Sequence, residues 1–123
     1  MTETAPDPRL RLRVVFGDGA MIGPGKADLL ERIRETGSIS AAGRAMAMSY
    51  KRAWSLVEEM NAAFREPLVA STRGGPQGGG AQLTAAGAAV VAHYRAIEAR
   101  AAEAGAEHIA AIRGMLRDIS GGK

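Results

Sequence analysis

The sequence predicts a mainly α-helical fold with a small β component. Residues 37–64 contain two helical patterns separated by a tight turn, the first short and small-sided, the second longer and amphipathic. A glycine-rich segment between two short apolar stretches follows them. An apolar stripe at helical spacing then continues almost to the C-terminus. A chain of 123 residues is long enough for one domain, or for one small domain with an appended helix.

The composition excludes several classes of protein. Apolar residues make up 46% of the chain but aromatic residues only 4%, so alanine must fill much of the interior, which favours closely packed helices over a large ligand cavity. The absence of cysteine excludes disulfide scaffolds and thiolate metal sites. No apolar run approaches the ~20 residues of a membrane span, and the start, MTETAPDPRLRLR, does not resemble a signal peptide. We therefore expect a cytoplasmic protein without a membrane partner.

The first part of the chain predicts a strand followed by a helix. Residues 1–8 are expected to be a flexible N-terminus. Arginine alternates with Leu10, Leu12 and Val14 over residues 9–14, a period of two that predicts a strand with the leucines and valine inward. Three arginines on the other face are typical of a protected edge strand; contact with nucleic acid is the alternative. After the glycine-rich turns at 17–19 and 23–25, a helix is expected over residues 26–35 and ends at Gly37.

The next two helices have clear start signals. Ser38 is a suitable N-cap for a helix over residues 39–47, whose alanines give it a thin profile. Ser49 is a suitable N-cap for a helix over residues 50–64. The buried stripe expected on that second helix is Ala53, Val57, Met60 and Phe64. Trp54 flanks this stripe and is interpreted as a core anchor rather than a base-stacking platform.

A β-hairpin should follow. Pro67 stops the preceding helix, a short strand begins at Leu68, and residues 81–83 return as a second strand after the glycine tract. The tract is interpreted as the tip of a wing, with a plain flexible hairpin as the alternative. A phosphate-binding loop fits less well, because no Lys-Ser/Thr pair follows the last glycine.

A long last helix is expected from Ala85 to about Ile119, capped by Thr84. One small domain cannot easily bury so long a stripe, so pairing with the same helix of a second subunit is the natural solution. The alternative is a helix folded back on its own domain, with a kink near Gly105. The dimerisation residues expected from the stripe are Val90, Tyr94, Ile97, Ala101, Ile109, Ile112 and Leu116.

Together these elements predict a winged helix-turn-helix over residues 9–84, with a long C-terminal dimerisation helix over residues 85–123. In such a fold the second helix of the pair enters the major groove of DNA. The Lys51 and Arg52 side chains can donate hydrogen bonds to guanine, whereas hydroxyl groups and the N–H groups of helix N-termini can donate to phosphate. The alternative is that Lys51 and Arg52 form a solvent-exposed cationic face with no DNA contact. The net charge of +3 is compatible with DNA without establishing it. The DNA-contacting residues predicted are Ser38, Ser40, Arg44, Ser49, Tyr50, Lys51, Arg52, Ser55, Arg73, Gly74, Gly75 and Gln77.

Catalytic and metal sites are not expected. His93 and His108 lie 15 residues apart and have no neighbouring cysteine or paired acidic motif. Glu58 and Glu59 are adjacent and diverge on a helix, so they cannot act as an acid/base pair. No nucleophile motif is visible, and we expect neither an enzyme nor a bound cofactor.

From about residue 22 to residue 94 the chain resembles the N-terminal domain of the ModE family of molybdate-responsive regulators, a relative of the LysR-type DNA-binding domain. The resemblance rests on IGPGKADLLERIRETGSISAAGRAMAMSYKRAWSLVEEMN and LVASTRGGPQGGGAQLTAAG, in this order and spacing. It implies a homodimer that binds an operator with two-fold character, with the helix at 49–55 in the major groove and the wing beside the backbone. Family members often carry an arginine soon after the LV pair, where this chain has Ala70-Ser71 and its arginine only at Arg73. Full-length members continue into a molybdate-binding region, so no molybdate site is expected in this chain, which ends at Lys123.

The leading hypothesis is a dimeric, sequence-specific transcription factor linked to molybdenum metabolism. The second is an interaction module that pairs through its last helix with a full-length relative or another regulator and has no specific DNA binding of its own. Direct binding of a small ligand to the DNA-binding domain is a third possibility, for which the residues give no support.

Overall fold

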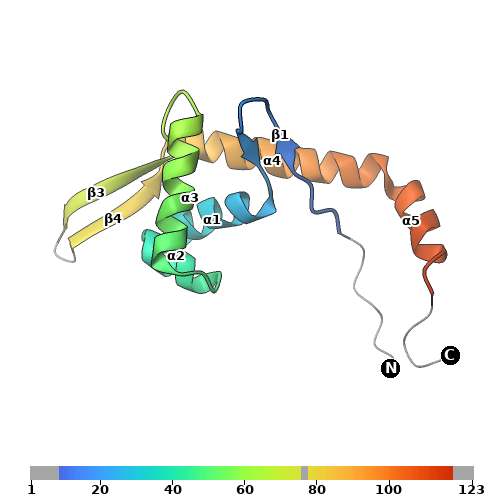
Figure 1. The fold of residues 1–123 in the computed structure, drawn as a ribbon, viewed down its shortest axis with the longest axis horizontal. Coiled ribbons are helices and arrows are strands. Elements are labelled where there is room, and N and C mark those ends of the chain that lie inside the picture. The colour runs from blue at the N-terminus through green and yellow to red at the C-terminus, as the bar shows by residue number, and fades with distance from the viewer. Residues whose placement is uncertain (1–8, 76–77, 118–123) are drawn as a thin grey trace.

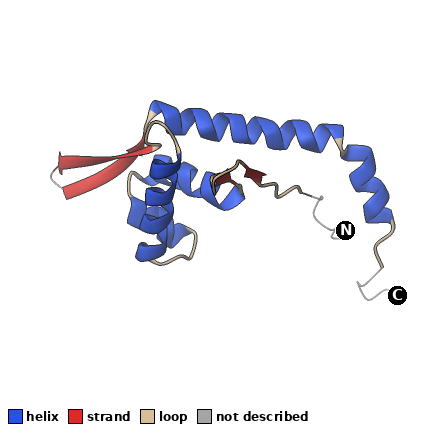
Figure 2. Ribbon diagram, turned by 45° about the horizontal axis from the view of Figure 1, so that its top comes forward, coloured by secondary structure: helices blue, strands red, loops and turns tan. Residues whose placement is uncertain are grey.

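The structure is a computed structural model that describes residues 9–75 and 78–117. The elements are β1 (Val14–Val15), β2 (Met21–Ile22), α1 (Pro24–Thr36), α2 (Ile39–Ala45), α3 (Tyr50–Ala63), β3 (Val69–Gly75), β4 (Gly78–Leu83), α4 (Ala85–Ala104) and α5 (Ala106–Gly114). Helices α1, α2 and α3 form the body, the β3–β4 hairpin projects from it as a wing, and α4 runs past the body to α5 (Figure 1). Figure 2 shows the same arrangement by element type, with the wing as the larger of the two antiparallel hairpins. This is the predicted winged helix-turn-helix with a long C-terminal helix.

The helix boundaries follow from local capping chemistry. Helix α1 starts at Pro24, two residues before the predicted start, because proline is well suited to the first turn, where no N–H partner is required. It ends at Gly37, whose left-handed φ of 73° is the predicted glycine C-cap. The hydroxyls of Ser38, Ser49 and Thr84 each accept a backbone N–H three residues on, at 3.0 Å. All three predicted N-caps are therefore confirmed.

One main core holds the body, the wing and α4 together. Leu29, Leu30 and Ile33 of α1 are fully buried and pack with the inner faces of α2 and α3. Ala53, Val57 and Met60 of the predicted α3 stripe are buried, while Phe64 is half-buried beside the core. The remaining members of the main cluster are Ile39, Ala42, Leu56, Leu68, Val69, Ala81 and Val91. Val91 extends this core onto the long helix.

Three hydrogen bonds between one side chain and the backbone fix the start of the wing. The Asn61 amide group on α3 accepts the N–H groups of Leu68 and Val69 at 2.8 and 3.1 Å, and donates to the Val69 carbonyl oxygen at 3.1 Å. On the second strand of the wing, the Ala81 N–H donates to the Gly37 carbonyl oxygen at 2.9 Å. The wing is thus tied to both α3 and the α1–α2 junction.

The strand predicted over residues 9–14 is much shorter in the structure. Only residues 14 and 15 are strand, paired with the unpredicted β2 at residues 21 and 22. The alternation of exposure is nevertheless present, since Leu10, Leu12 and Val14 are half-buried and the arginines between them are exposed. We refer to residues 9–13 as the N-terminal arm. The arm is held by α4 rather than by a long ladder, because the Tyr94 hydroxyl donates to the Leu12 carbonyl oxygen at 2.7 Å.

The last helix is bent at Gly105, near which the sequence allowed a kink. Helix α4 ends at Ala104, Gly105 has φ −96° and ψ 5°, and α5 continues at an angle (Figure 1). In the described part of the chain the helical residues end at Gly114, short of the predicted Ile119, which lies outside the described residues. Among the helices described, none is both long and apolar enough to cross a membrane.

Candidate nucleic-acid interface

The turn between α2 and α3 is closed by small residues and one strained position. A Cβ on Gly43 would lie 2.9 Å from the Ala53 Cβ, so only glycine permits α2 to cross α3 at this distance. Ala47 adopts a left-handed φ of 58°, and Met48 N–H donates to the Gly43 carbonyl oxygen at 2.9 Å. Helix α2 ends at Ala45 rather than at the predicted Ala47, because the chain turns here. The thin first helix expected from the sequence is therefore what allows the close crossing.

The first turns of α3 present an exposed polar and cationic surface. Tyr50, Lys51, Arg52 and Ser55 are all exposed, as predicted. Ser49 is exposed too, but its hydroxyl oxygen already accepts the Arg52 N–H. No acidic residue lies in the first turn of α3, so the positive end of the helix dipole is not neutralised there. This surface can accept a polyanion.

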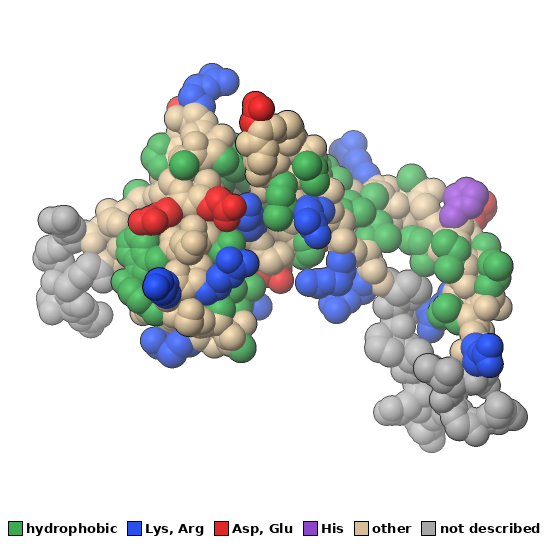
Figure 3. Space-filling view, viewed as in Figure 1, with side chains coloured by type: hydrophobic (Ala, Val, Ile, Leu, Met, Phe, Trp, Pro, Cys, Tyr) green, Lys and Arg blue, Asp and Glu red, His purple; other side chains and the backbone are tan. Residues whose placement is uncertain are grey.

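The charges are segregated along α3. Arg44, exposed in the last turn of α2, adds a cation at the end where α2 meets the start of α3. Glu58 and Glu59 are exposed farther along α3. Figure 3 shows blue side chains around the end of the body where α2 and the start of α3 meet, with red ones farther along.

The two serines predicted at the start of α2 lie in a separate region. Ser38 and Ser40 are half-buried with their hydroxyl oxygens 3.2 Å apart, at the opposite end of α2 from Arg44. They line a hollow between the body and the base of the wing, and Tyr50 lines it too. The structure therefore brings Ser38, Ser40 and Tyr50 together and leaves Arg44 apart from them.

The wing is more regular than a flexible tip. Strands β3 and β4 pair from Val69↔Leu83 to Gly75↔Gly78, with a register shift between Thr72 and Gly75. The expected glycine tip over 74–80 is thus mostly strand, which corrects that prediction. Arg73, Gly74 and Gly75 lie in β3, whereas Gln77 lies outside the described residues.

Comparison with known proteins places this geometry in a family. Residues 26–88, half of the chain, match the family model described as "Bacterial regulatory helix-turn-helix protein, lysR family". The chain belongs to the LysR family of bacterial regulatory helix-turn-helix proteins. It carries the helix-turn-helix DNA-binding domain of that family. The crystal structure of a CbnR_DBD–DNA complex has the same fold, with a TM-score of 0.55 and 24% identity over 72% of this chain and 95% of that one.

Relatives named for molybdenum confirm the resemblance to the ModE family. The molybdenum-pterin-binding protein MopB of Rhodobacter capsulatus is 48% identical over 85 residues, which cover 69% of this chain and 32% of MopB. The molybdenum transport protein ModE of Azotobacter vinelandii is 45% identical over 65% of this chain and 30% of its own length. The transcriptional regulator ModE of Yersinia pestis is 41% identical over 58% of this chain and 27% of its own length. The matches thus span about a third of the length of these relatives.

An ion-pair cluster joins the body of this LysR-family domain to its long helix. The Arg95 guanidinium on α4 donates to Asp28 at 2.7 Å, to both Glu31 carboxylate oxygens at 2.9 and 3.1 Å, and to Glu98 at 2.9 Å. Its guanidinium carbon lies 5.6 Å from the Tyr94 ring centroid. The hydrogen bond from Arg95 holds the pKa of Glu31 below its ordinary value, and the three carboxylates raise the pKa of Arg95. Burial raises the pKa of Tyr94.

No sequence pattern predicts this cluster. Asp28 and Glu31 lie three residues apart on α1, and Arg95 and Glu98 three apart on α4, a spacing that marks one helix face. Nothing in that spacing connects two faces that are 64 residues apart along the chain. The pairing depends on how α4 crosses α1, which the structure alone provides.

The predicted dimerisation stripe divides into two parts. Tyr94 is only 1% exposed and packs inside its own chain, so the prediction that it faces a partner is wrong, whereas Val90 is half-buried beside both cores. Ile97, Ile112 and Leu116 are exposed by 42, 62 and 69%. Ala101 and Ile109 are half-buried. The apolar surface available to a partner therefore begins near Ile97 and continues onto α5.

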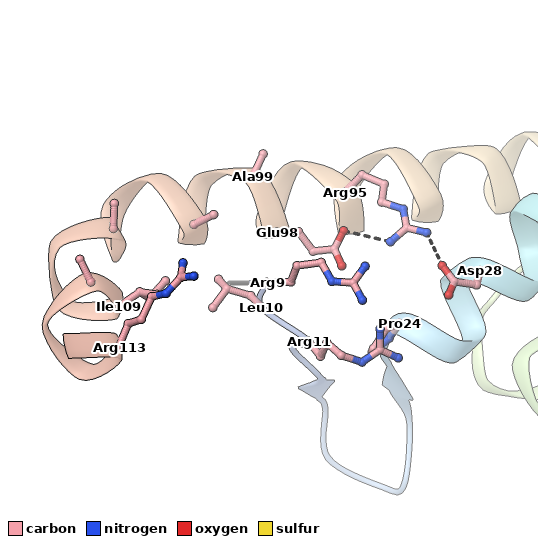
Figure 4. Close-up of a pocket in the computed structure, with 13 residues that line it drawn as sticks. Arg9, Leu10, Arg11, Pro24, Asp28, Arg95, Glu98, Ala99, Ile109 and Arg113 are labelled. Carbon is pink, nitrogen blue, oxygen red and sulfur yellow. Dashed lines mark hydrogen bonds and ion pairs between the residues drawn. The ribbon is translucent and has the colours of Figure 1, made fainter. Parts of the chain in front are cut away.

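A cleft of about 800 Å³ opens where the N-terminal arm faces the bend between α4 and α5. Arg9 and Arg11 lie on the arm side of this cleft and Ile109 and Arg113 on the α5 side (Figure 4). Alanines of both helices also line it. Arg95 lies at the far end, where it is occupied by its ion pairs. The lining of this cleft is partly apolar, and cationic side chains lie at its edges.

Proposed function

We propose that the chain is a homodimeric transcriptional regulator in which α3 reads the major groove of a two-fold-related operator. The observation that carries the proposal is the uncompensated, exposed N-terminal end of α3. Cationic and hydroxyl side chains there surround a positive helix end, on a helix-turn-helix scaffold of the LysR family.

The roles of the contact residues follow from their chemistry and position. Lys51 and Arg52 are the base-reading residues, because they are exposed on the first turn of α3 and can donate to guanine. Tyr50 and Ser55 lie beside them and donate hydroxyl protons to the DNA backbone. The remaining proposed backbone contacts are Ser38, Ser40, Arg44, Ser49, Arg73, Gly74, Gly75 and Gln77.

The exposed apolar surface of the last two helices supports the homodimer. Within the described part of the chain, Ile97, Ile112, Met115 and Leu116 are exposed, and isologous pairing of two such surfaces would bury them. The bend at Gly105 directs α5 and the adjoining cleft away from the helix-turn-helix, so a partner there leaves α3 free (Figure 1).

The link to molybdenum rests on the names of the relatives. MopB and ModE are named for molybdenum and match this chain over its DNA-binding region. We infer that the operator recognised by this chain lies beside genes of molybdenum metabolism. The region matched is only about a third of those proteins, so their whole activity is not carried over.

Selection of bound sequences from random DNA, followed by gel shift, tests the proposal. Lys51→Ala and Arg52→Ala should each weaken binding to the selected site by about 10- to 100-fold, with relaxed preference at the contacted bases. Arg100→Ala, an exposed cation on α4, is the matched control and should leave sequence preference unchanged. Binding that is equally tight for all three variants would contradict the proposal.

A second candidate function is an interaction module, which the exposed Ile112 of α5 and the exposed Met115 and Leu116 just after it favour. Light scattering on Ile112→Asp and on Leu116→Asp tests the interface itself: both should be monomeric where the parent chain is a dimer. His108→Asp, on the same helix, serves as the control. A chain that selects no DNA sequence yet pairs with a full-length relative is an interaction module.

A further inference from the structure

Among the described residues, one buried side-chain polar atom has no hydrogen-bond partner: the indole N–H of Trp54. A buried donor without an acceptor costs free energy, so such groups are rare and call for an explanation. Trp54 lies one turn after Tyr50 on α3, and the two rings meet edge to face with centroids 6.1 Å apart. The ring was expected to be a core anchor, and it does pack partly against the main core.

Trp54 also lines the hollow between the body and the base of the wing, which we call the wing groove. Its volume is about 310 Å³. The hydroxyl-bearing residues that line it come from three elements: Ser38 and Ser40 from the start of α2, Tyr50 from α3, and Ser71 and Thr72 from β3. No acidic side chain lines it. Hydroxyl protons without a competing carboxylate suit an oxyanion.

The walls of the wing groove are held in place by the fold. Ala81 N–H donates to the Gly37 carbonyl oxygen at 2.9 Å, which fixes β4 against the α1–α2 junction. A Cβ on Gly80 would lie 2.9 Å from both that oxygen and the Thr72 hydroxyl, so the residue at this position must be glycine for the wing to sit this close. The groove is therefore a built feature between the two parts of the domain that are proposed to contact DNA.

We propose that the wing groove seats one backbone phosphate of the bound DNA, and that the Trp54 indole N–H is a donor to it. This inference rests on the proposed function, and it adds Trp54, Ser71 and Thr72 to the contact residues. The phosphate lies where the backbone passes from the major groove at α3 to the wing. The indole N–H is buried in the DNA-free chain, so the seating includes a small displacement of the groove wall.

Trp54→Phe keeps an aromatic ring in the core and removes only the N–H. The thermal midpoint of the free protein should not fall by more than a few degrees, because the N–H that is lost has no partner there. Affinity for the selected DNA site should fall by about tenfold, since a hydrogen bond to a charged group is lost. The order of preference among sequences should not change, because phosphate contacts carry no sequence information.

Ser71→Ala and Thr72→Val test the same site without touching the core, and should lower affinity by a few-fold with the same unchanged preference. His93→Ala removes an exposed polar side chain on α4, which does not line the groove, and is the control. If Trp54→Phe, Ser71→Ala and Thr72→Val all bind as the parent does, while Lys51→Ala has lost binding, the wing groove is not a phosphate site and the proposed function stands.

A chemical substitution in the DNA identifies the phosphate. Replacing each phosphate of the selected site in turn by an uncharged methylphosphonate should reveal one position at which the parent chain loses affinity but Trp54→Phe loses little more. An equal loss in both proteins at every position would overturn the inference. Trp54 is the only tryptophan in the chain, so its emission should change during titration with the DNA site and should not change with inorganic phosphate at millimolar concentration. A response to inorganic phosphate instead would mean a free-anion site and would also overturn it.

Discussion

The Tyr94 hydroxyl on α4 donates a hydrogen bond of 2.7 Å to the Leu12 carbonyl oxygen, 82 residues earlier in the chain. The Tyr94 ring packs in a second small core with Ile22 and Ala27, so it anchors the β1–β2 hairpin and the arm to the long helix. Tyr94 was expected to face a second subunit, but it instead joins the N-terminal arm to α4 within its own chain.

Tyr94→Phe should lower the free energy of unfolding by about 1 kcal/mol, because it removes one hydrogen bond and leaves the ring packed. Tyr94→Ala should cost about 3–5 kcal/mol through loss of the buried ring. Tyr50→Phe is the control: Tyr50 is 58% exposed, and the change should stay within about 0.5 kcal/mol. Denaturant unfolding measures all three. An equal loss for Tyr50→Phe and Tyr94→Phe would show that the Leu12 contact contributes nothing.

The Arg95 cluster should make stability depend on acid pH. The pKa of Glu31 is lowered in the folded state, so its contribution is complete above the ordinary value of 4.5 and is lost as the pH falls through the folded pKa. Glu31→Gln should therefore cost about 1 kcal/mol at pH 7, and the difference from the parent chain should narrow between about pH 5 and pH 3. Glu35→Gln, whose exposed partner is Arg32, should show little difference at any pH. A gap for Glu31→Gln that stays constant down to pH 3 would exclude this role.

The parts of the fold that the sequence predicts are those with local chemical signals. Ser38, Ser49 and Thr84 cap their helices as expected, and Gly37 ends α1, because a cap depends on residues within one turn of itself. The exposure of Lys51 and Arg52 was predicted for a similar reason, since the apolar stripe of α3 defines which face is buried.

The features that were missed depend on contacts between distant segments. The arm alternates like a strand, but no long partner strand lies beside it, so it is regular only at residues 14 and 15. Tyr94 keeps the helical spacing of a dimer stripe, but spacing cannot show that β2 and α1 cover it. The wing groove lies between α2, α3 and β3, and no linear pattern shows that the buried N–H of Trp54, which lines the groove, lacks a partner.

The Asn61 side chain should be essential for the position of the wing. Asn61→Ala leaves two backbone N–H groups of the wing start without their acceptor, which should cost about 2–3 kcal/mol. Asn61→Asp keeps the acceptor oxygen but replaces the donor to Val69 by a carboxylate oxygen that the Val69 carbonyl oxygen repels, so it should also be destabilising, by less than Asn61→Ala. Amide hydrogen exchange at Leu68 and Val69 should accelerate in the same order. Unchanged exchange at these two amides in Asn61→Ala would contradict the assignment.

Gly87 determines how closely α4 approaches the start of the wing. A Cβ at this position would collide with the Leu68 carbonyl oxygen, which already accepts the Thr84 N–H at 3.0 Å, so the obstacle is backbone that cannot rotate away. Gly87→Ala should therefore lower the free energy of unfolding by about 2–4 kcal/mol, although alanine is intrinsically the better helix former by about 1 kcal/mol. Gly114→Ala is the matched control, because it is helical too and nothing lies within 4 Å of its added Cβ. That variant should be neutral or gain about 0.5 kcal/mol. Thermal or denaturant unfolding of the two variants side by side decides the point: equal stability would show that α4 does not depend on close contact with Leu68.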